Sequence, residues 1–232
     1  MVNSKNAFWQ ALVVTVFIFI AGLVLGFYVE LSNVNKSDLL IRNAEVDLLD
    51  QQIKMSSLTN SVNFNCEVAK NNLFKFADDI YADVVKFEEE DGQSKFTVNQ
   101  RRILHKRYDL LRVNLWQDSL EIRSKCNESF HTVLYLFDYA SPDVGIKSQQ
   151  RVFSLVLLDL KYKHPEEVLL LPIASNLDLD SVSMIKENYN ISTSPSVVID
   201  ESDVITSLIT LDQLEQKVFG SGNSTNIIVL KP

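Results

Sequence analysis

The chain has 232 residues, 46% of them hydrophobic, and a formal net charge of −8. This length and composition supply a core for one ordinary domain with additional segments. The negative charge excludes nucleic acid as an expected partner, because phosphate binding requires a basic face. The two cysteines, Cys66 and Cys126, lie far apart and neither belongs to a CxxC motif, so zinc-ribbon and dithiol motifs are absent.

The N-terminal segment is uncharged from Ala7 to Tyr28. As a helix it would be about 33 Å long, enough for a bilayer core of about 30 Å. Trp9 and Tyr28 stand near its two ends, where amphipathic rings prefer the membrane interface. We predict an uncleaved signal-anchor, a single transmembrane helix within residues 1–29. A buried helix of a soluble protein and a cleaved signal peptide are the alternatives.

The charges beside this segment indicate its orientation. Lys5 precedes it and Glu30 is the first charge after it, which favours a cytoplasmic N-terminus. We therefore expect a single-pass protein of the cell membrane with most of the chain extracytoplasmic. Glycosylation sequons are consistent with that side and occur four times after the anchor, at Asn35, Asn127, Asn190 and Asn223.

Residues 30–62 are polar and predict a helical stalk. Apolar residues recur every seven positions, at Val34, Ile41, Leu48 and Met55, but the second seam of a strong coiled coil is poor. The pattern predicts a stalk that pairs loosely with itself or with a partner, and hence an oligomer. A single amphipathic helix lying on its own domain is the alternative.

Residues 63–128 predict a helical hairpin, with helices over about 67–89 and 98–125 separated by an acidic, Gly-containing break. Cys66 opens the first helix and Cys126 closes the second, so an antiparallel hairpin brings them together. We predict a structural disulfide that adds about 4 kcal/mol by closing a loop of about 60 residues. The alternative is a pair of unbridged, buried thiols.

Residues 129–221 predict an α/β domain, followed by a tail at residues 222–232. A buried strand at residues 131–137 precedes a helix, a second strand at 166–174 and a short helix capped by Asp180 or Ser181. Two strands joined by the tight turn DESD, and a helix capped by Thr210 and ended by Gly220, follow. The order β-α-β-α-β-β-α predicts three layers, with a parallel β-α-β unit and an antiparallel hairpin.

This element order and the stretch ISTSPSVVID resemble the thioredoxin fold over about residues 130–220. The resemblance implies a cis Ser194–Pro195 bond beside an active-site turn, which here reads SPDV. Ser141 and Val144 stand where redox-active members carry the two cysteines of CxxC, with Pro142 and Asp143 between them. The resemblance therefore implies a redox turn without thiols, and a groove between this turn and Pro195 that binds an extended peptide.

The residues of the turn indicate local structure. Ser141 is a good N-cap and Pro142 a good first helical residue. Serine catalysis would need a base and an oxyanion hole, and no motif links Ser141 to any of the three histidines, His105, His131 and His164. We find no metal-binding motif and expect no cofactor and no catalytic activity.

The sequence thus predicts a membrane-anchored, extracytoplasmic thioredoxin-like protein that binds another protein or acts as a scaffold. A structural subunit of a membrane complex is one alternative. The other is a disulfide oxidoreductase that uses Cys66 or Cys126, which requires one of them to be exposed beside the groove.

Overall fold

The computed structural model describes residues 8–29, 46, 49–50, 53–54, 65–91, 97–127 and 130–220. The heptad positions of the predicted stalk, the tail at residues 222–232, and the sequons at Asn35 and Asn223 lie outside that part. The helices and strands after the stalk follow in the order α2 (Cys66–Asp91), α3 (Val98–Cys126), β1 (His131–Phe137), α4 (Val144–Lys163), β2 (Val168–Ala174), α5 (Asp180–Asn188), β3 (Ser196–Ile199), β4 (Asp203–Ile205) and α6 (Leu211–Phe219).

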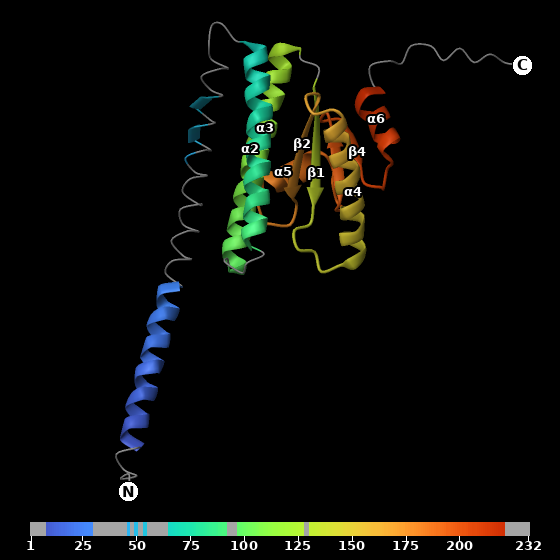
Figure 1. Cartoon of the computed structure of the whole chain (residues 1–232). Coiled ribbons are helices and arrows are strands. Elements are labelled where there is room, and N and C mark those ends of the chain that lie inside the picture. The colour runs from blue at the N-terminus through green and yellow to red at the C-terminus, as the bar shows by residue number, and fades with distance from the viewer. Residues whose placement is uncertain are drawn as a thin grey trace, which may run out of the picture.

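The N-terminal apolar segment forms one helix, Phe8–Val29 (Figure 1). It is 22 residues long, and none of its most apolar stretch is buried by the rest of the chain. Its length and composition are sufficient to cross a membrane. The predicted transmembrane helix is confirmed to that extent, while its orientation stays a prediction.

The four strands form one mixed sheet in the order β2-β1-β3-β4. β1 pairs parallel with β2, from His131 opposite Val168 to Phe137 opposite Ala174. β3 pairs antiparallel with both β1 and β4. The predicted element order and the antiparallel terminal hairpin are therefore confirmed.

Helices cover both faces of the sheet (Figure 1). Successive side chains of β1 point to opposite faces. Leu134 and Leu136 pack in the core formed with α2, α3 and α5, whereas Val133 and Tyr135 pack in the core formed with α4 and α6. Because both faces are covered, β1 is buried along nearly its whole length, which explains its unbroken apolar sequence.

The helical hairpin packs directly on the sheet. Thr97 caps α3 in a capping box with Gln100, and residues of α2 and α3 share one core with the sheet, including Leu73, Leu115 and Leu136. Cys66 and Cys126 are bonded to each other with their Cα atoms 5.5 Å apart, which confirms the predicted disulfide. The bridge joins the start of α2 to the end of α3, beside the entry into β1.

Candidate functional site

The sheet brings the two predicted site segments to one of its ends. β1 ends at Phe137 and leads into the turn at residues 138–143, while Ser196, the first residue of β3, lies opposite Leu136. Ser194 and Pro195 therefore lie at the same end of the sheet as the SPDV turn. We call residues 138–143, 175–178 and 193–195 the turn end. It lies outside the carboxyl ends of the parallel strands, a common position for sites in α/β proteins.

The turn at residues 141–144 differs from the sequence expectation in its cap. α4 begins at Val144, and Asp143 is its N-cap, with Oδ1 accepting a hydrogen bond of 3.0 Å from the N–H of Ile146. The prediction that Ser141 caps the helix and Pro142 starts it is wrong. Ser141 is instead buried, 4% exposed, and its Oγ accepts from the N–H of Asp143 at 3.4 Å. A carboxylate in the cap position interacts favourably with the helix dipole.

Ser141 has no catalytic partner within the described residues. His131 lies at the opposite end of β1, and His164 lies beyond the end of α4. His105 does reach the turn end, where its ring stands 4.2 Å from that of Tyr139, but the hydrogen bond of the Ser141 hydroxyl in the described part of the chain is to the Asp143 N–H. Nucleophilic activation needs a base within hydrogen-bonding distance. The geometry gives serine catalysis no support.

Hydrogen bonds between side chains and turn backbone hold the turn end together. Asn176, after β2, accepts from the N–H of Tyr139 at 2.7 Å and donates to its carbonyl at 3.0 Å. Ser175 donates to Asp138 at 2.8 Å, and Gln150 donates to the Asp138 carbonyl at 3.1 Å. The sequence analysis missed these residues. The sequence could have indicated Asp138 and Asn176, because Asp and Asn residues directly after strands commonly form hydrogen bonds with turn backbone.

The Ser194–Pro195 bond is cis, as the resemblance implied. Pro195 is buried, and the Oγ of Ser194 is enclosed without a hydrogen-bond partner in the described part of the chain. The neighbouring Ser196 hydroxyl donates to the Thr193 carbonyl at 2.5 Å. A buried hydroxyl without a partner is uncommon in folded proteins. The role of this segment in a peptide groove stays a prediction.

Asp109 of α3 is a second incompletely satisfied group, at the carboxyl end of β2. It is 1% exposed, accepts from the N–H of Ala174 and pairs with Arg112 at 3.4 Å, but its Oδ2 has no partner among the described residues. Burial raises the pKa of Asp109 to about 7, although Arg112 and the Ala174 N–H lower it. A carboxyl group that is half protonated near neutral pH is a feature often found near functional sites.

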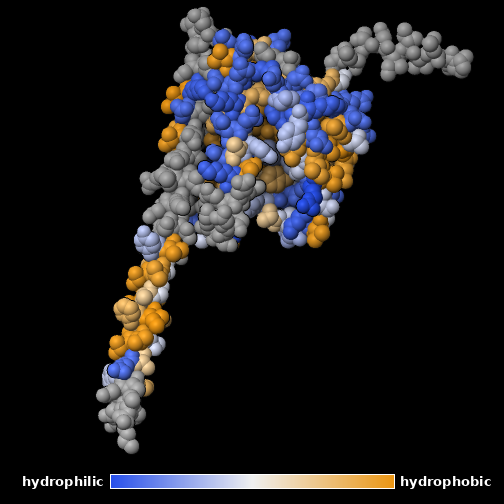
Figure 2. Space-filling view, viewed as in Figure 1, coloured by the Kyte–Doolittle hydropathy of each residue, from blue (hydrophilic) through white to orange (hydrophobic). Residues whose placement is uncertain are grey.

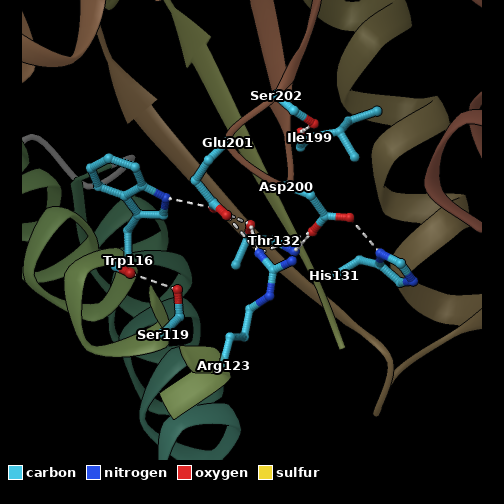
Figure 3. A network of polar contacts seen from close by, with 9 residues as sticks. All are labelled: Trp116, Ser119, Arg123, His131, Thr132, Ile199, Asp200, Glu201 and Ser202. Carbon is cyan, nitrogen blue, oxygen red and sulfur yellow. Dashed lines mark hydrogen bonds and ion pairs between the residues drawn. The ribbon is translucent and has the colours of Figure 1, made fainter. Parts of the chain in front are cut away.

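The opposite end of the sheet carries a network of charges (Figure 3). Arg123 of α3 donates to Glu201 at 2.6 Å and lies 3.2 Å from Asp200, and Trp116 donates to Glu201 at 3.2 Å. Asp200 and Glu201 are the central residues of the β3–β4 turn. We call this network, with Thr132 and His131 of β1, the charged clamp.

The clamp holds a strained turn. Asp200 and Glu201 have φ angles of 46° and 58°, a left-handed conformation that residues other than Gly rarely adopt. Thr132 N–H donates to Asp200 at 3.0 Å, and His131 Nδ1 lies 2.6 Å from the other carboxylate oxygen. Burial alone would raise the pKa of Asp200, but these two bonds and the charges of His131 and Arg123 hold it below its usual value. The polar groups of the clamp are hydrogen-bonded or ion-paired with one another, which is typical of a site that stabilises the fold.

The disulfide, two of the sequons and the side chains able to bind a metal can also be located. The disulfide lies on the clamp side of the sheet, because α3 ends at Cys126 and β1 starts at His131. Two sequon asparagines, Asn127 and Asn190, are exposed. In the part of the chain that the structure describes, no group of three or more His, Cys, Asp or Glu side chains is placed to hold a metal ion.

Comparisons with known proteins leave the family open. No family model matches the chain, and no curated protein matches it. The structure is similar to the crystal structure of the germline-specific thioredoxin Deadhead from Drosophila melanogaster, at 16% sequence identity and a TM-score of 0.29. The similar region covers 46% of this chain and 92% of that chain.

Proposed function

We propose that the chain is a single-pass, membrane-anchored protein-binding module with an extracytoplasmic thioredoxin-like domain that performs no thiol–disulfide exchange. One observation carries this proposal. The sequence contains two cysteines, and they are bonded to each other on the clamp side of the sheet. The turn end has Ser141 and Val144 where a redox pair would stand. Thiol–disulfide exchange requires a thiolate, and the side chains of Ser141 and Val144 contain no sulfur.

The turn end is the proposed binding surface. The Ser194 hydroxyl in it has no hydrogen-bond partner in the described part of the chain, and Val144 beside it is 79% exposed. An extended segment of a partner supplies backbone N–H and C=O groups that can satisfy such positions. Exposed apolar side chains next to polar backbone are the usual composition of a recognition surface.

The redox part of the proposal is tested by alkylating the purified chain with and without prior reduction and measuring its intact mass. We expect alkylation only after reduction, and no reductase activity on insulin. Two alkylated thiols without reduction, or measurable reductase activity, would overturn the proposal in favour of an oxidoreductase. A mass loss on glycosidase treatment at the exposed Asn127 or Asn190 tests the extracytoplasmic orientation.

The binding surface is tested by purifying the full chain from its own membrane and measuring the amount of co-purifying protein. Val144→Asp places a charge on the turn end without opening a core, and we expect at least a tenfold loss of the partner. Met184→Asp is the matched control, because Met184 is 62% exposed on α5, away from this turn. Equal partner recovery with Val144→Asp and Met184→Asp would remove the turn end as the binding surface.

A further inference from the structure

A groove of about 570 Å³ opens between α2 and α4, above the outer edge of β2. α2 contributes Tyr81, Val84 and Val85 to its wall, α4 contributes Leu158 and Tyr162 among others, and Leu170 and Pro172 of β2 form part of its floor. Figure 2 shows this hollow between the two helices, with hydrophobic side chains inside it and along the α4 side. Its volume and apolar lining are typical of a binding pocket.

The apolar character of the groove extends onto its rim. Tyr162 on α4 is 73% exposed, and Tyr81 on α2 is also exposed. These side chains stand on both sides of the opening and are continuous with the lining. A contiguous apolar surface of this kind normally marks a place where another apolar segment binds.

Few backbone N–H and C=O groups at the outer edge of β2 lack a hydrogen-bond partner. Pairing with β1 turns the backbone of Val168, Leu170, Pro172 and Ala174 toward the groove side. Lys161 donates to the Val168 carbonyl at 3.1 Å, Asp109 accepts from the Ala174 N–H, and Pro172 has no N–H. In the described part of the chain, Leu170 N–H and C=O and the Pro172 C=O have no partner. This edge therefore suits one short extended segment and not a long added strand.

The sequence contains one short segment that fits this space. Residues 221–226 read SGNSTN, a polar and flexible linker, and residues 227–230 read IIVL. Four consecutive apolar residues, three of them β-branched, favour an extended conformation and are unfavourable when exposed to water. Their length matches the short stretch of β2 edge that remains open.

The attachment point of this segment lies beside the groove. Phe219 ends α6, and its ring stands 4.4 Å from that of His164. The next residue after His164, Pro165, lines the groove. Seven residues from Gly220 to residue 227 span at most about 25 Å and about 15 Å on average for a flexible chain. The groove is within that reach.

The stalk is a poorer occupant, because it meets a different face of α2. Asp50 and Lys54 lie beside Asn72, Lys75 and Asp79. The groove is lined by another side of the helix, which carries Asp78, Tyr81 and Val85. Residues spaced this way point in different directions around a helix of 3.6 residues per turn.

We infer that residues 227–230 of this chain occupy the groove between α2 and α4, with an extended backbone that pairs with Leu170 and side chains that cover the apolar lining. The segment acts as an internal plug at the β2 edge. The groove reaches the turn end at His105, Phe137 and Gln150. The inference does not depend on the proposed function, because it rests on the groove lining and residues 227–230 and not on the groups of the turn.

Hydrogen–deuterium exchange on the full chain in lipid nanodiscs tests the plug, since detergent would compete for the groove. We expect the amides of residues 227–230 to exchange at least tenfold more slowly than in the free peptide of residues 221–232. Tyr162→Asp places a charge at the groove rim and should abolish that protection. Met184→Asp is the control of equal charge and similar exposure on α5, and it should leave the protection unchanged.

A second pair of variants changes the segment instead of the groove. Ile228→Asp with Val229→Asp should abolish protection at residues 227–230 and speed exchange of the Leu170 amide. Ser221→Asp with Ser224→Asp adds the same charge to the linker and should change neither. Free exchange of residues 227–230 in the wild-type chain overturns the inference. Protection that survives Tyr162→Asp, or that disappears on dilution, also overturns it, the latter by placing the segment in a second copy.

Discussion

The two ends of the sheet are built from different kinds of interaction. At the clamp, Arg123, Asp200 and Glu201 form ion pairs that satisfy one another, and the disulfide lies on the same side. At the turn end, neutral hydrogen bonds between Asn176 and Tyr139 close the loops, and the ion pair of Asp178 with Arg102 is exposed to solvent. The turn end also encloses polar atoms that have no partner within the described residues, on Asp109 and Ser194.

The two ends differ in how completely their polar groups are paired. Groups that are fully paired have little to gain from a ligand, whereas enclosed polar groups without partners gain a hydrogen bond. Left-handed residues occur at both ends, Asp200 and Glu201 in the clamp and Ala140 and Asp178 in the turn end, so backbone strain does not distinguish them. The paired groups of the clamp fit a role in stability, and the enclosed hydroxyl of Ser194 is consistent with the proposed role of the turn end in recognition.

The largest expected effect tests the disulfide on the clamp side. Cys66→Ser should lower the free energy of unfolding by about 4 kcal/mol, because the bridge closes a 60-residue separation in the unfolded chain. Urea denaturation of the soluble part, or of the full chain in nanodiscs, measures the change. The reduced wild-type protein is the control and should unfold at the same urea concentration as the variant. A loss below about 1 kcal/mol would show that the bridge contributes little.

The next effect tests the buried carboxyl at the turn end through pH. The pKa of Asp109 is about 7 in the folded chain and near 3.8 in the unfolded chain, so the folded state keeps the proton to a higher pH. The contribution of Asp109 to stability should be fully present below about pH 4 and be lost as pH rises toward 7, by about 3 kcal/mol between pH 5 and pH 8. Urea denaturation across that range measures the slope.

Asp109→Asn is the matched variant for this prediction, since the amide keeps an acceptor for the Ala174 N–H and does not ionise. Most of the slope should disappear in the variant. A smaller slope of the same sign should remain, because burial and, to a lesser degree, Glu121 raise the pKa of Asp118 to about 6. An unchanged slope would mean that Asp109 is ionised in the folded chain at pH 5.

The smallest effect separates backbone strain from side-chain contacts in the clamp. Glu201→Ala should destabilise the chain by about 2 kcal/mol, because it removes the contacts to Arg123, Trp116 and Thr132. Glu201→Gly removes the same contacts but also relieves the left-handed backbone, and it should be less destabilising than Ala by about 1 kcal/mol. Thermal or urea unfolding of both variants is the measurement. If Ala and Gly are equally destabilising, the turn stores no backbone strain.

Much of the fold could be predicted because its signals are local. The hairpin helices, the cap at Thr210 and the stop at Gly220 each follow from residues a few positions apart. The caps of α4 and α5 could not be predicted in this way. Several polar residues stand before each helix, and packing selects among them: Asp143 caps α4, whereas Leu179 occupies the cap position of α5 without any side-chain hydrogen bond. The prediction of Asp180 or Ser181 as that cap is wrong.

By itself, the sequence determined the element order, the apolar N-terminal helix and the absence of a thiol at residues 141–144. It favoured a bond between Cys66 and Cys126 but left free thiols open, and the structure contains the bond. Only the tertiary structure decided which polar residues meet. Arg123 and Glu201 are 78 positions apart, and Asn176 is 37 positions from Tyr139. Contacts of this kind depend on the crossing of elements that pack through their apolar faces, so no local pattern specifies them. The groove beside β2 arises for the same reason, from the separation between α2 and α4.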